Sequence, residues 1–290
     1  MTDVPLAELC DVHKAFGGRT ALAGASFAVR RGDVVALLGR NGAGKTTAIR
    51  ILLGLRRPDA GLARLAGRDP TDAKTRRAVG STPQETDLPE TLRVSEVLDL
   101  VRAHYPLPTP RAQLASRFGI GGLLDRATGS LSGGQRRRVA VALAFAGNPR
   151  LVVLDEPSSG LDRSARTSLW EAIRASAATG RGILLATHDL SEAAALATRV
   201  VLLEEGRAVV DGRIDELGRH STSTRVEIPR QRLPRLVHAD EVAASGDRLV
   251  LLTRAPGLLM RELVGSGADL GELCVCPLSL EEALARGERG

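Results

Sequence analysis

A glycine-rich stretch holds the residues best suited to chemistry in this sequence. Residues 39–46 read GRNGAGKT, which matches the spacing G-x-x-x-x-G-K-[ST]. Glycines let such a loop turn tightly and bring backbone N–H groups against a polyphosphate. Lys45 can reach the β- and γ-phosphates of a nucleotide, and the Thr46 hydroxyl can ligate Mg²⁺. The stretch therefore predicts a phosphate site, and a glycine-rich turn without a ligand is the alternative.

A pair of acids forms the second candidate. Asp155 and Glu156 directly follow the apolar run at 151–154. At the carboxyl end of a strand, Asp155 can hold Mg²⁺ directly or through water, and Glu156 could polarise an attacking water. A strand that ends in two acids is common by itself, so this interpretation depends on the phosphate loop upstream.

The third candidate is the segment LSGGQ at residues 131–135. Ser132 is a good N-cap for a helix predicted over 136–146, and two glycines expose N–H groups to an anion. By itself the segment could be an ordinary capped turn. Because one loop already grips the phosphates, a second anion-binding helix start needs a separate explanation.

Alternating strands and helices must position these groups. Short apolar runs predict buried strands at 34–38, 151–154, 183–186 and 200–203, and helical patterns cover 45–55 and 164–178. This alternation implies crossover units and a largely parallel sheet that is covered on both faces.

Two further regions lie outside that alternation. Residues 92–128 are predicted to be mostly helical, as part of a helical subdomain at about 92–148, and a linker is predicted at 218–224. Beyond the linker, three short strands (225–228, 249–252, 273–276), helical patterns between them and a last helix capped by Ser279 (280–286) predict a small α+β domain. The expected division is a domain at 1–217 and a second at 218–290.

Composition narrows the class of protein. The chain has 290 residues, of which 43% are hydrophobic and 26% are charged, so wholesale disorder is excluded. No apolar run approaches the roughly 18 to 20 residues that span a bilayer, and the N-terminus lacks a leader pattern. We therefore expect a cytosolic protein. Cys10, Cys274 and Cys276 are too few for a disulfide scaffold and lack zinc-ligand spacing.

The net charge of +6 raises nucleic acid or an anionic membrane as possible partners. Aromatic residues make up only 2% of the chain, which leaves few platforms for stacking bases. Residues 1–215 carry 30 basic and 23 acidic side chains, against 10 and 11 in residues 216–290. The basic excess thus lies with the phosphate loop, where polyphosphate or a membrane face accounts for it without nucleic acid.

Over about residues 5–215 the chain resembles the nucleotide-binding subunit of ABC transporters, with the family's motifs in the family's order. The resemblance implies the P-loop NTPase fold of an ABC ATPase domain, with ATP and Mg²⁺ bound. Gln84 in STPQ resembles the glutamine that approaches Mg²⁺ and senses the membrane subunit. Asp162 in SSGLD resembles the acid that communicates across a dimer, and His188 resembles the switch histidine at the γ-phosphate. Phe16 lies where the family stacks an aromatic ring on adenine, and a core strand residue is the alternative.

The resemblance assigns roles to individual positions. The catalytic group is Glu156, His188, Lys45 and Gln84. The metal ligands are Thr46, Gln84 and Asp155. The ATP-binding residues are Phe16, Gly39, Asn41, Gly42, Ala43, Gly44, Lys45, Thr46, Thr47, Ser132, Gly133, Gly134, Gln135 and Asp162.

The resemblance also implies partners. Two subunits of the family pack head to tail, and each ATP is gripped by one phosphate loop and the opposite LSGGQ helix. With one copy of each motif, we expect a homodimer, a separate integral membrane permease and no nucleic acid. The family usually has Thr at Ser158, often Pro at Arg163 and frequently Asp at Thr198, and none of these departures touches a chemical role.

The end of the chain, PLSLEEAL at 277–284, resembles the ending of exporters of the daunorubicin-resistance type. That resemblance implies export of a hydrophobic drug, antibiotic, lipid or polysaccharide, from the cytoplasmic face of the membrane. A capped terminal helix without special meaning is the alternative for the segment. For the whole chain, an ABC-type ATPase acting on DNA or ribosomes and an importer subunit remain as alternatives. The first would need an insertion or a tandem ATPase unit that this sequence lacks.

Overall fold

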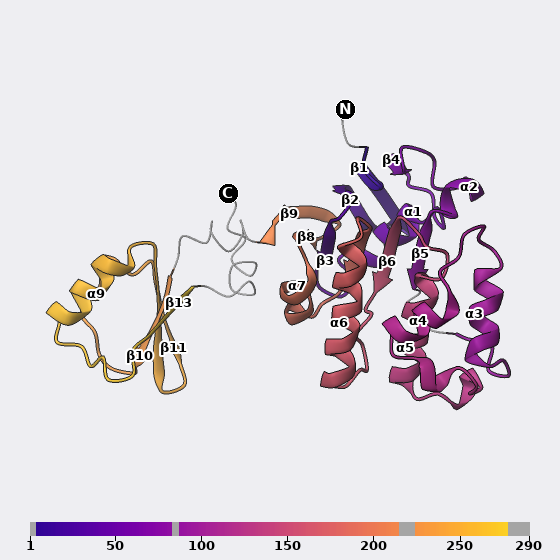
Figure 1. Ribbon diagram of the computed structural model, residues 1–290. Coiled ribbons are helices and arrows are strands. Elements are labelled where there is room, and N and C mark those ends of the chain that lie inside the picture. Colours follow the sequence, from indigo (N-terminus) through magenta and orange to yellow (C-terminus); the bar gives the residue numbers. More distant parts are fainter. Residues whose placement is uncertain (1–3, 83–86, 215–223, 278–290) are drawn as a thin grey trace. The chain divides into compact units, whose positions relative to one another are not determined.

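The computed structural model describes residues 4–82, 87–214 and 224–277. The chain divides into two compact units, residues 1–212 and 213–290, and each is considered by itself (Figure 1). The domain boundary expected between residues 217 and 218 lies outside the described residues. So does the linker predicted at 218–224, except for Thr224, which is the first residue of strand β10 (Thr224–Pro229).

A six-stranded sheet forms the centre of the first unit. In spatial order it contains β5 (Val79–Thr82), β6 (Leu151–Asp155), β7 (Gly182–Ala186), β3 (Val34–Leu38), β8 (Arg199–Glu204) and β9 (Arg207–Arg213). The pairs β5–β6, β6–β7, β7–β3 and β3–β8 are parallel. The carboxyl ends of β3 and β6 therefore lie at the same edge of the sheet, where the phosphate loop and the two acids follow them.

Both faces of this sheet are covered, which explains why its strands are continuous apolar runs. Along β6, Val152 and Leu154 pack into one core cluster, and Leu151 and Val153 pack into the other. Helices α5 (Gly133–Ala144) and α6 (Arg163–Ala177) contribute to the first cluster, and α1 (Lys45–Leu52) contributes to the second. The prediction of a largely parallel, doubly covered sheet is confirmed for this unit.

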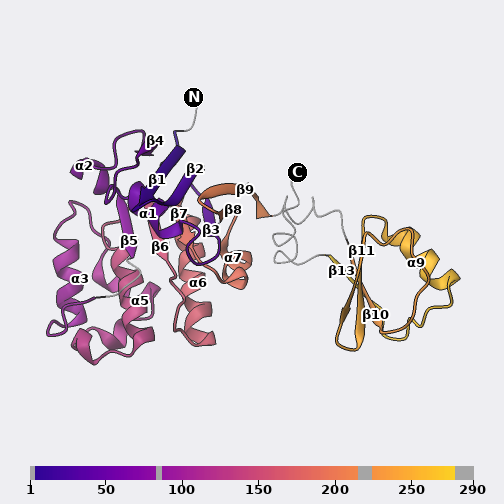
Figure 2. The ribbon, with the colours of Figure 1, turned by 180° about the vertical axis from the view of Figure 1, so that it is seen from behind.

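A separate antiparallel sheet of β1 (Ala7–Phe16), β2 (Arg19–Val29) and β4 (Ala60–Leu65) was not predicted from the sequence. Buried and exposed residues follow one another irregularly along β1 and β2, because register shifts interrupt the pairing of these two strands. Figure 2, seen from behind, shows β1, β2 and β4 on the side of this unit away from α3 (Val94–Arg102) and α5.

The helical region follows the prediction for residues 92–128 in outline. It contains α3 (Val94–Arg102), α4 (Arg111–Arg117) and two short 3-10 turns, η1 (Gly121–Leu123) and η2 (Thr128–Ser130). The short helix α2 (Ala73–Arg76) precedes β5, and α7 (Leu190–Leu196) lies between β7 and β8. No helix in the described part of the chain combines the length and apolar character needed to cross a bilayer.

Two predicted helix limits were wrong. Helix α1 ends at Leu52 rather than at residue 55, because Gly54 adopts a φ of +67° that an α-helix cannot continue. Helix α5 (Gly133–Ala144) begins three residues before the predicted start at 136. The Ser132 side chain caps it, so the glycines form the first helical turn rather than a loop before it.

The described residues of the second unit form a four-stranded antiparallel sheet and one helix, as expected for an α+β domain. The strand order is β11 (Glu241–Ser245), β12 (Arg248–Thr253), β10 (Thr224–Pro229) and β13 (Cys274–Pro277). Leu259 and Leu263 of α9 (Pro256–Gly265) pack on Val226 and Leu251. Strand β11 was missed, and the helix predicted before β12 is absent among the described residues there. The predicted helix at 280–286 lies outside them.

Candidate active site

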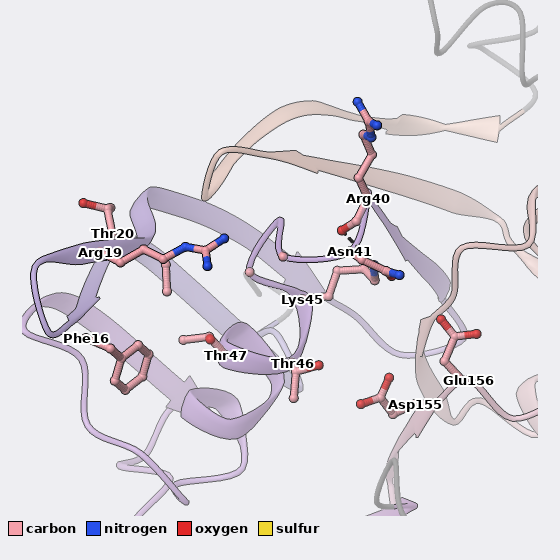
Figure 3. A pocket seen from close by; sticks show the side chains of 13 residues that line it. Phe16, Arg19, Thr20, Arg40, Asn41, Lys45, Thr46, Thr47, Asp155 and Glu156 are labelled. Atoms are coloured by element: carbon pink, nitrogen blue, oxygen red, sulfur yellow. Dashed lines mark hydrogen bonds between the residues drawn. The ribbon is translucent and has the colours of Figure 1, made fainter.

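Nine of the eighteen residues predicted for the site line one cavity of the first unit. Its volume is about 450 Å³. Its lining comprises Phe16, Arg19, Thr20, Ala21, Arg40, Asn41, Gly42, Gly44, Lys45, Thr46, Thr47, Asp155 and Glu156. In Figure 3, Phe16 lies at one end of the cavity and Asp155 and Glu156 lie at the other, with Lys45 and Thr46 between them.

The glycines of the phosphate loop meet definite packing demands. A Cβ atom on Gly39 would lie 2.5 Å from the carbonyl oxygen of Leu203, and one on Gly44 would lie 2.5 Å from that of Ala21. Both glycines also have positive φ values, 148° and 105°. The loop can therefore pass between β8 and β2 only without side chains at these positions. Gly44 is the N-cap of α1, so the N–H groups of the helix start face the cavity.

Lys45 is the first residue of α1, and its side chain returns along the loop. It is only 9% exposed, and Nζ donates to the carbonyl oxygens of Gly39, at 2.5 Å, and Arg40, at 3.3 Å. The ammonium group is thereby held over the concave side of the loop. A phosphate there would meet a fixed positive charge together with backbone N–H groups.

Asp155 and Glu156 differ in backbone conformation at the carboxyl end of β6. Asp155 is the last strand residue and is 5% exposed, and its N–H donates to Thr82 Oγ1 at 3.2 Å. Burial raises the pKa of Asp155, and the neighbouring Glu156 carboxylate raises it further, whereas the cationic side chains of Arg137 and Lys45 lower it. Glu156 leaves the strand with a φ of +50°, which turns its side chain into the same cavity.

His188 reaches Glu156 from the end of the next strand. Its Nδ1 lies 2.7 Å from Glu156 Oε1, and its ring is 68% exposed while the Glu156 side chain is 21% exposed. Neighbouring Asp189 caps α7, accepting hydrogen bonds from the N–H groups of Ser191 and Glu192. Since β6 and β7 are parallel neighbours, their carboxyl ends bring these two side chains together across 32 residues of sequence.

The oxygen donors of the cavity fit a hard divalent cation. Thr46 and Asp155 both line it, and a hydroxyl and a carboxylate are oxygen ligands of the kind that Mg²⁺ takes beside a phosphate. A cation here would also offset the unfavourable burial of the Asp155 carboxylate. The third predicted metal ligand, Gln84, lies outside the described residues.

Phe16 is not a core residue. It is 43% exposed at the end of β1 and lines the cavity, so the alternative interpretation of a buried strand residue is wrong. Lys14 Nζ lies 5.5 Å from the ring centroid, and the Arg56 guanidinium carbon lies 5.7 Å from it. The aromatic ring therefore lies near two cationic side chains at one end of the cavity, where a flat base could stack on it.

The LSGGQ segment does not line this cavity. Ser132 Oγ accepts from the Gln135 N–H at 3.3 Å, and Gln135 Oε1 accepts from the Ser132 N–H at 3.1 Å, which is a complete capping box. Ser132 and Gly133 are exposed. The segment is therefore an open helix start on another part of the unit, with Gly134 packed against the carbonyl oxygen of Gly160.

Asp162 and Ser158 each make hydrogen bonds that stabilise the fold of this unit. Asp162 Oδ1 accepts from the Ala165 N–H at 2.8 Å and caps α6. Four residues earlier in the chain, Ser158 donates to the buried carboxylate of Glu192, and Trp170 Nε1 donates to both of them. The departure from the family's Thr at position 158 therefore keeps the hydroxyl group on which this contact depends.

Four cavity-lining residues were not singled out from the sequence: Arg19, Thr20, Ala21 and Arg40. Arg40 occupies a variable position of the phosphate-loop motif, so the motif itself could have indicated it. The other three begin β2 after the turn at Gly17 and Gly18, and only the pairing of β1 with β2 brings them to the loop. Among the predicted residues that the structure describes, eight are not in the lining: Gly39, Ala43, Ser132, Gly133, Gly134, Gln135, Asp162 and His188.

Comparisons with known proteins agree on one family. Residues 22–159 match the family model described as ABC transporter. The Nod factor export ATP-binding protein I of Ralstonia nicotianae is 37% identical over 272 residues, covering 89% of this chain and 85% of that protein. The daunorubicin resistance ATP-binding protein DrrA2 of Streptomyces coeruleorubidus is 37% identical over 248 residues, covering 81% and 76%. A solved ATP-binding subunit of an ABC transporter superposes with a TM-score of 0.68 at 33% identity, covering 74% of this chain and 92% of that one.

Proposed function

Because this chain belongs to the ABC transporter family as an ATP-hydrolysing subunit, we propose that it energises export of a hydrophobic compound through a separate membrane permease. The observation that carries the proposal is the single cavity in which the phosphate loop, Asp155 and Glu156 meet. The names of two relatives, a Nod factor export protein and a daunorubicin resistance protein, favour export over import.

The proposed reaction is in-line attack of a water on the γ-phosphate of ATP. Glu156 polarises the water, and its Oε1 lies 2.7 Å from Nδ1 of His188, the residue proposed to contact the γ-phosphate. Lys45 and the N–H groups of the helix start stabilise the negative charge that spreads over the phosphoryl oxygens. Phe16 stacks on the base at the other end of the cavity. When bound, Mg²⁺ neutralises phosphate charge, and Thr46 and Asp155 are the residues that would hold it.

A homodimer completes the proposed site. Ser132 and the start of α5 form an exposed anion-binding helix end that the cavity of the same chain does not use. In a head-to-tail pair, each such helix start would face the ATP held by the other subunit. The positive charge of residues 1–215 supports a place against the cytoplasmic, anionic face of a membrane beside the permease.

The ATPase assignment is tested by phosphate release from the purified chain. Lys45→Ala should lose both ATP binding and hydrolysis, whereas Glu156→Gln should retain binding and lose turnover. Comparable hydrolysis by Glu156→Gln and the wild type would refute the role given to Glu156. The same variant with saturating ATP should be a dimer by light scattering, and a monomer would refute the paired sites.

The export assignment needs a separate experiment. The chain should co-purify from membranes with a polytopic membrane protein and should show no salt-sensitive binding to DNA or RNA. Salt-sensitive binding without a membrane partner would favour the alternative of an ATPase acting on nucleic acid or ribosomes. Uptake rather than efflux by vesicles that contain both subunits would favour an importer.

A further inference from the structure

A buried arginine contacts the backbone of Asp155 and Glu156, the two acids at the carboxyl end of β6. Arg137 belongs to α5 and is only 5% exposed, whereas its neighbours Arg136 and Arg138 are partly exposed. Its Nε donates to the carbonyl oxygen of Glu156 at 3.1 Å, and its Nη2 donates to the carbonyl oxygen of Asp155. One guanidinium group thus spans two consecutive backbone carbonyls.

The backbone that Arg137 contacts has a demanding conformation. Glu156 has a φ of +50°, a region that costs a non-glycine residue about 1 kcal/mol or more unless its surroundings hold it there. On the other side, the Glu156 N–H donates to the Ala186 carbonyl at 2.9 Å and the Asp155 N–H donates to Thr82. The turn is therefore held on its N–H side by the sheet. On its carbonyl side Arg137 holds both carbonyls, and the Ser159 N–H also donates to the Glu156 carbonyl at 3.1 Å.

Simple packing does not account for an arginine at this position. Burial lowers the pKa of the Arg137 guanidinium, while the charges of Asp155, Glu156 and Glu192 raise it, so the cation persists among three acids. An aliphatic side chain would fill the space without that desolvation. A planar guanidinium supplies what an aliphatic chain cannot, which is a rigid fork of donors aimed at two adjacent acceptors.

The helix that carries Arg137 begins at the LSGGQ segment, which the proposed dimer places at the ATP of the other subunit. Ser132, its N-cap, lies five positions before Arg137, which corresponds to about 7.5 Å along the helix. The carbonyls that Arg137 holds belong to the residues proposed for Mg²⁺ and for water activation. A shift of the start of α5 would therefore move Glu156, the proposed catalytic base of the same chain, through the Arg137 side chain.

We propose that Arg137 is a positioning residue that fixes the Asp155–Glu156 turn and ties the placement of the Glu156 carboxylate to the LSGGQ helix. This inference rests on the proposed ATPase function and concerns a residue outside the lining of the cavity. It predicts that loss of the guanidinium slows the chemical step and leaves ATP binding nearly intact.

The test compares Arg137→Met, which keeps an unbranched apolar side chain but removes all donors, with Arg137→Lys, which keeps the positive charge but lacks the planar fork of donors. Arg137→Met should lower kcat by about 10- to 100-fold, since a misplacement on the order of 1 Å has that effect, with KM for ATP changed by less than about twofold. Arg137→Lys should recover part of the lost kcat. The matched control is Arg138→Gln, because Arg138 lies on the same helix and donates to the Gly119 carbonyl at 3.1 Å instead.

A second readout does not depend on turnover. In hydrogen–deuterium exchange of the full chain, peptides that contain residues 155–158 should exchange faster in Arg137→Met than in the wild type, and Arg138→Gln should leave them unchanged. An inactive wild type would refute the proposed function, and this exchange measurement would still decide the inference. Unchanged exchange would overturn the inference, as would a kcat of Arg137→Met above half of the wild-type value or a Lys variant no more active than the Met variant.

Discussion

Replacing Glu192 should destabilise the ATPase unit in a manner that depends on both pH and the replacement. Glu192 is 1% exposed at the start of α7. Ser158 Oγ donates to its Oε1, and Trp170 Nε1 donates to the same oxygen at 3.2 Å. The side chain therefore joins α7, α6 and the segment after Glu156.

The magnitude follows from these contacts. In Glu192→Ala, Trp170 Nε1 keeps Ser158 Oγ as an acceptor at 2.9 Å, but the Ser158 hydroxyl loses its own acceptor. The buried Thr187 side chain loses its hydrogen bond to Glu192 as well. An unsatisfied buried hydroxyl costs about 1 to 3 kcal/mol, and the cavity left by the side chain adds to this loss. We expect Glu192→Ala to lower the free energy of unfolding by about 2 to 4 kcal/mol. Glu192→Gln keeps the acceptor oxygen and should change it by about 1 kcal/mol or less near pH 5.

The pH dependence has a definite sign. Burial raises the pKa of Glu192 above its ordinary value of 4.5, against the lowering effect of the hydrogen bonds from Ser158, Thr187 and Trp170. The folded chain therefore binds this proton more tightly than the unfolded chain does. The resulting stabilisation is complete below pH 4.5 and is lost as the pH rises through the raised folded-state pKa. Relative to the wild type, Glu192→Gln should become steadily more stable as the pH rises from 4.5 through the raised folded-state pKa of Glu192.

Trp170 makes the assay direct, because it is the single tryptophan of the chain and contacts Glu192. Urea unfolding followed by its fluorescence reports on residues 1–212 without a signal from the second unit. Parallel stability curves for wild type and Glu192→Gln across this pH range would refute the raised pKa. A loss below about 1 kcal/mol in Glu192→Ala would refute the structural role of the cluster.

Three other predictions test separate parts of the first unit. Gly80→Ala should cost about 3 kcal/mol or more in thermal unfolding, because its Cβ would lie 1.7 Å from the Ala144 carbonyl oxygen; unchanged melting would refute this packing. Phe16→Ala should raise KM for ATP by about 5- to 30-fold with kcat retained, and equal KM values would exclude stacking on the base. Asp162→Ala should lower stability by about 1 kcal/mol in urea while Asp162→Asn keeps the cap to Ala165, so equal losses would contradict a capping role.

The strands behind the site could be predicted because burial on both faces leaves an unambiguous pattern. Runs such as those of β3 and β6 are apolar at every position before the loop or the acids, so their type and their ends are visible in one dimension. Strand β11 could not be predicted, since all five of its residues are exposed and its existence depends on pairing with β12. The antiparallel sheet of β1, β2 and β4 was missed for a related reason, because bulges break its alternation.

Some functional side chains could likewise be identified from the sequence, and others could not. The motif spacing identified Lys45 and Thr46, whose positions follow from local geometry at a strand-to-helix turn. Three consecutive arginines at 136–138 are equivalent in the sequence, and nothing there distinguishes the buried middle residue from its neighbours. Its environment is made by β6 and by Glu192 of α7, which are distant along the chain.

The sequence by itself thus determined the chemistry of this protein, because phosphate binding and water activation depend on short motifs whose geometry is local. It also determined the parallel sheet, since hydrophobic burial on two faces is written directly into the residue pattern. Only the tertiary structure decided which groups meet. The contact between His188 and Glu156, the exposure of Phe16 and the grip of Arg137 on two carbonyls all depend on which strands lie side by side. Such contacts join residues far apart in the chain, and their energies depend on burial that no single segment possesses alone.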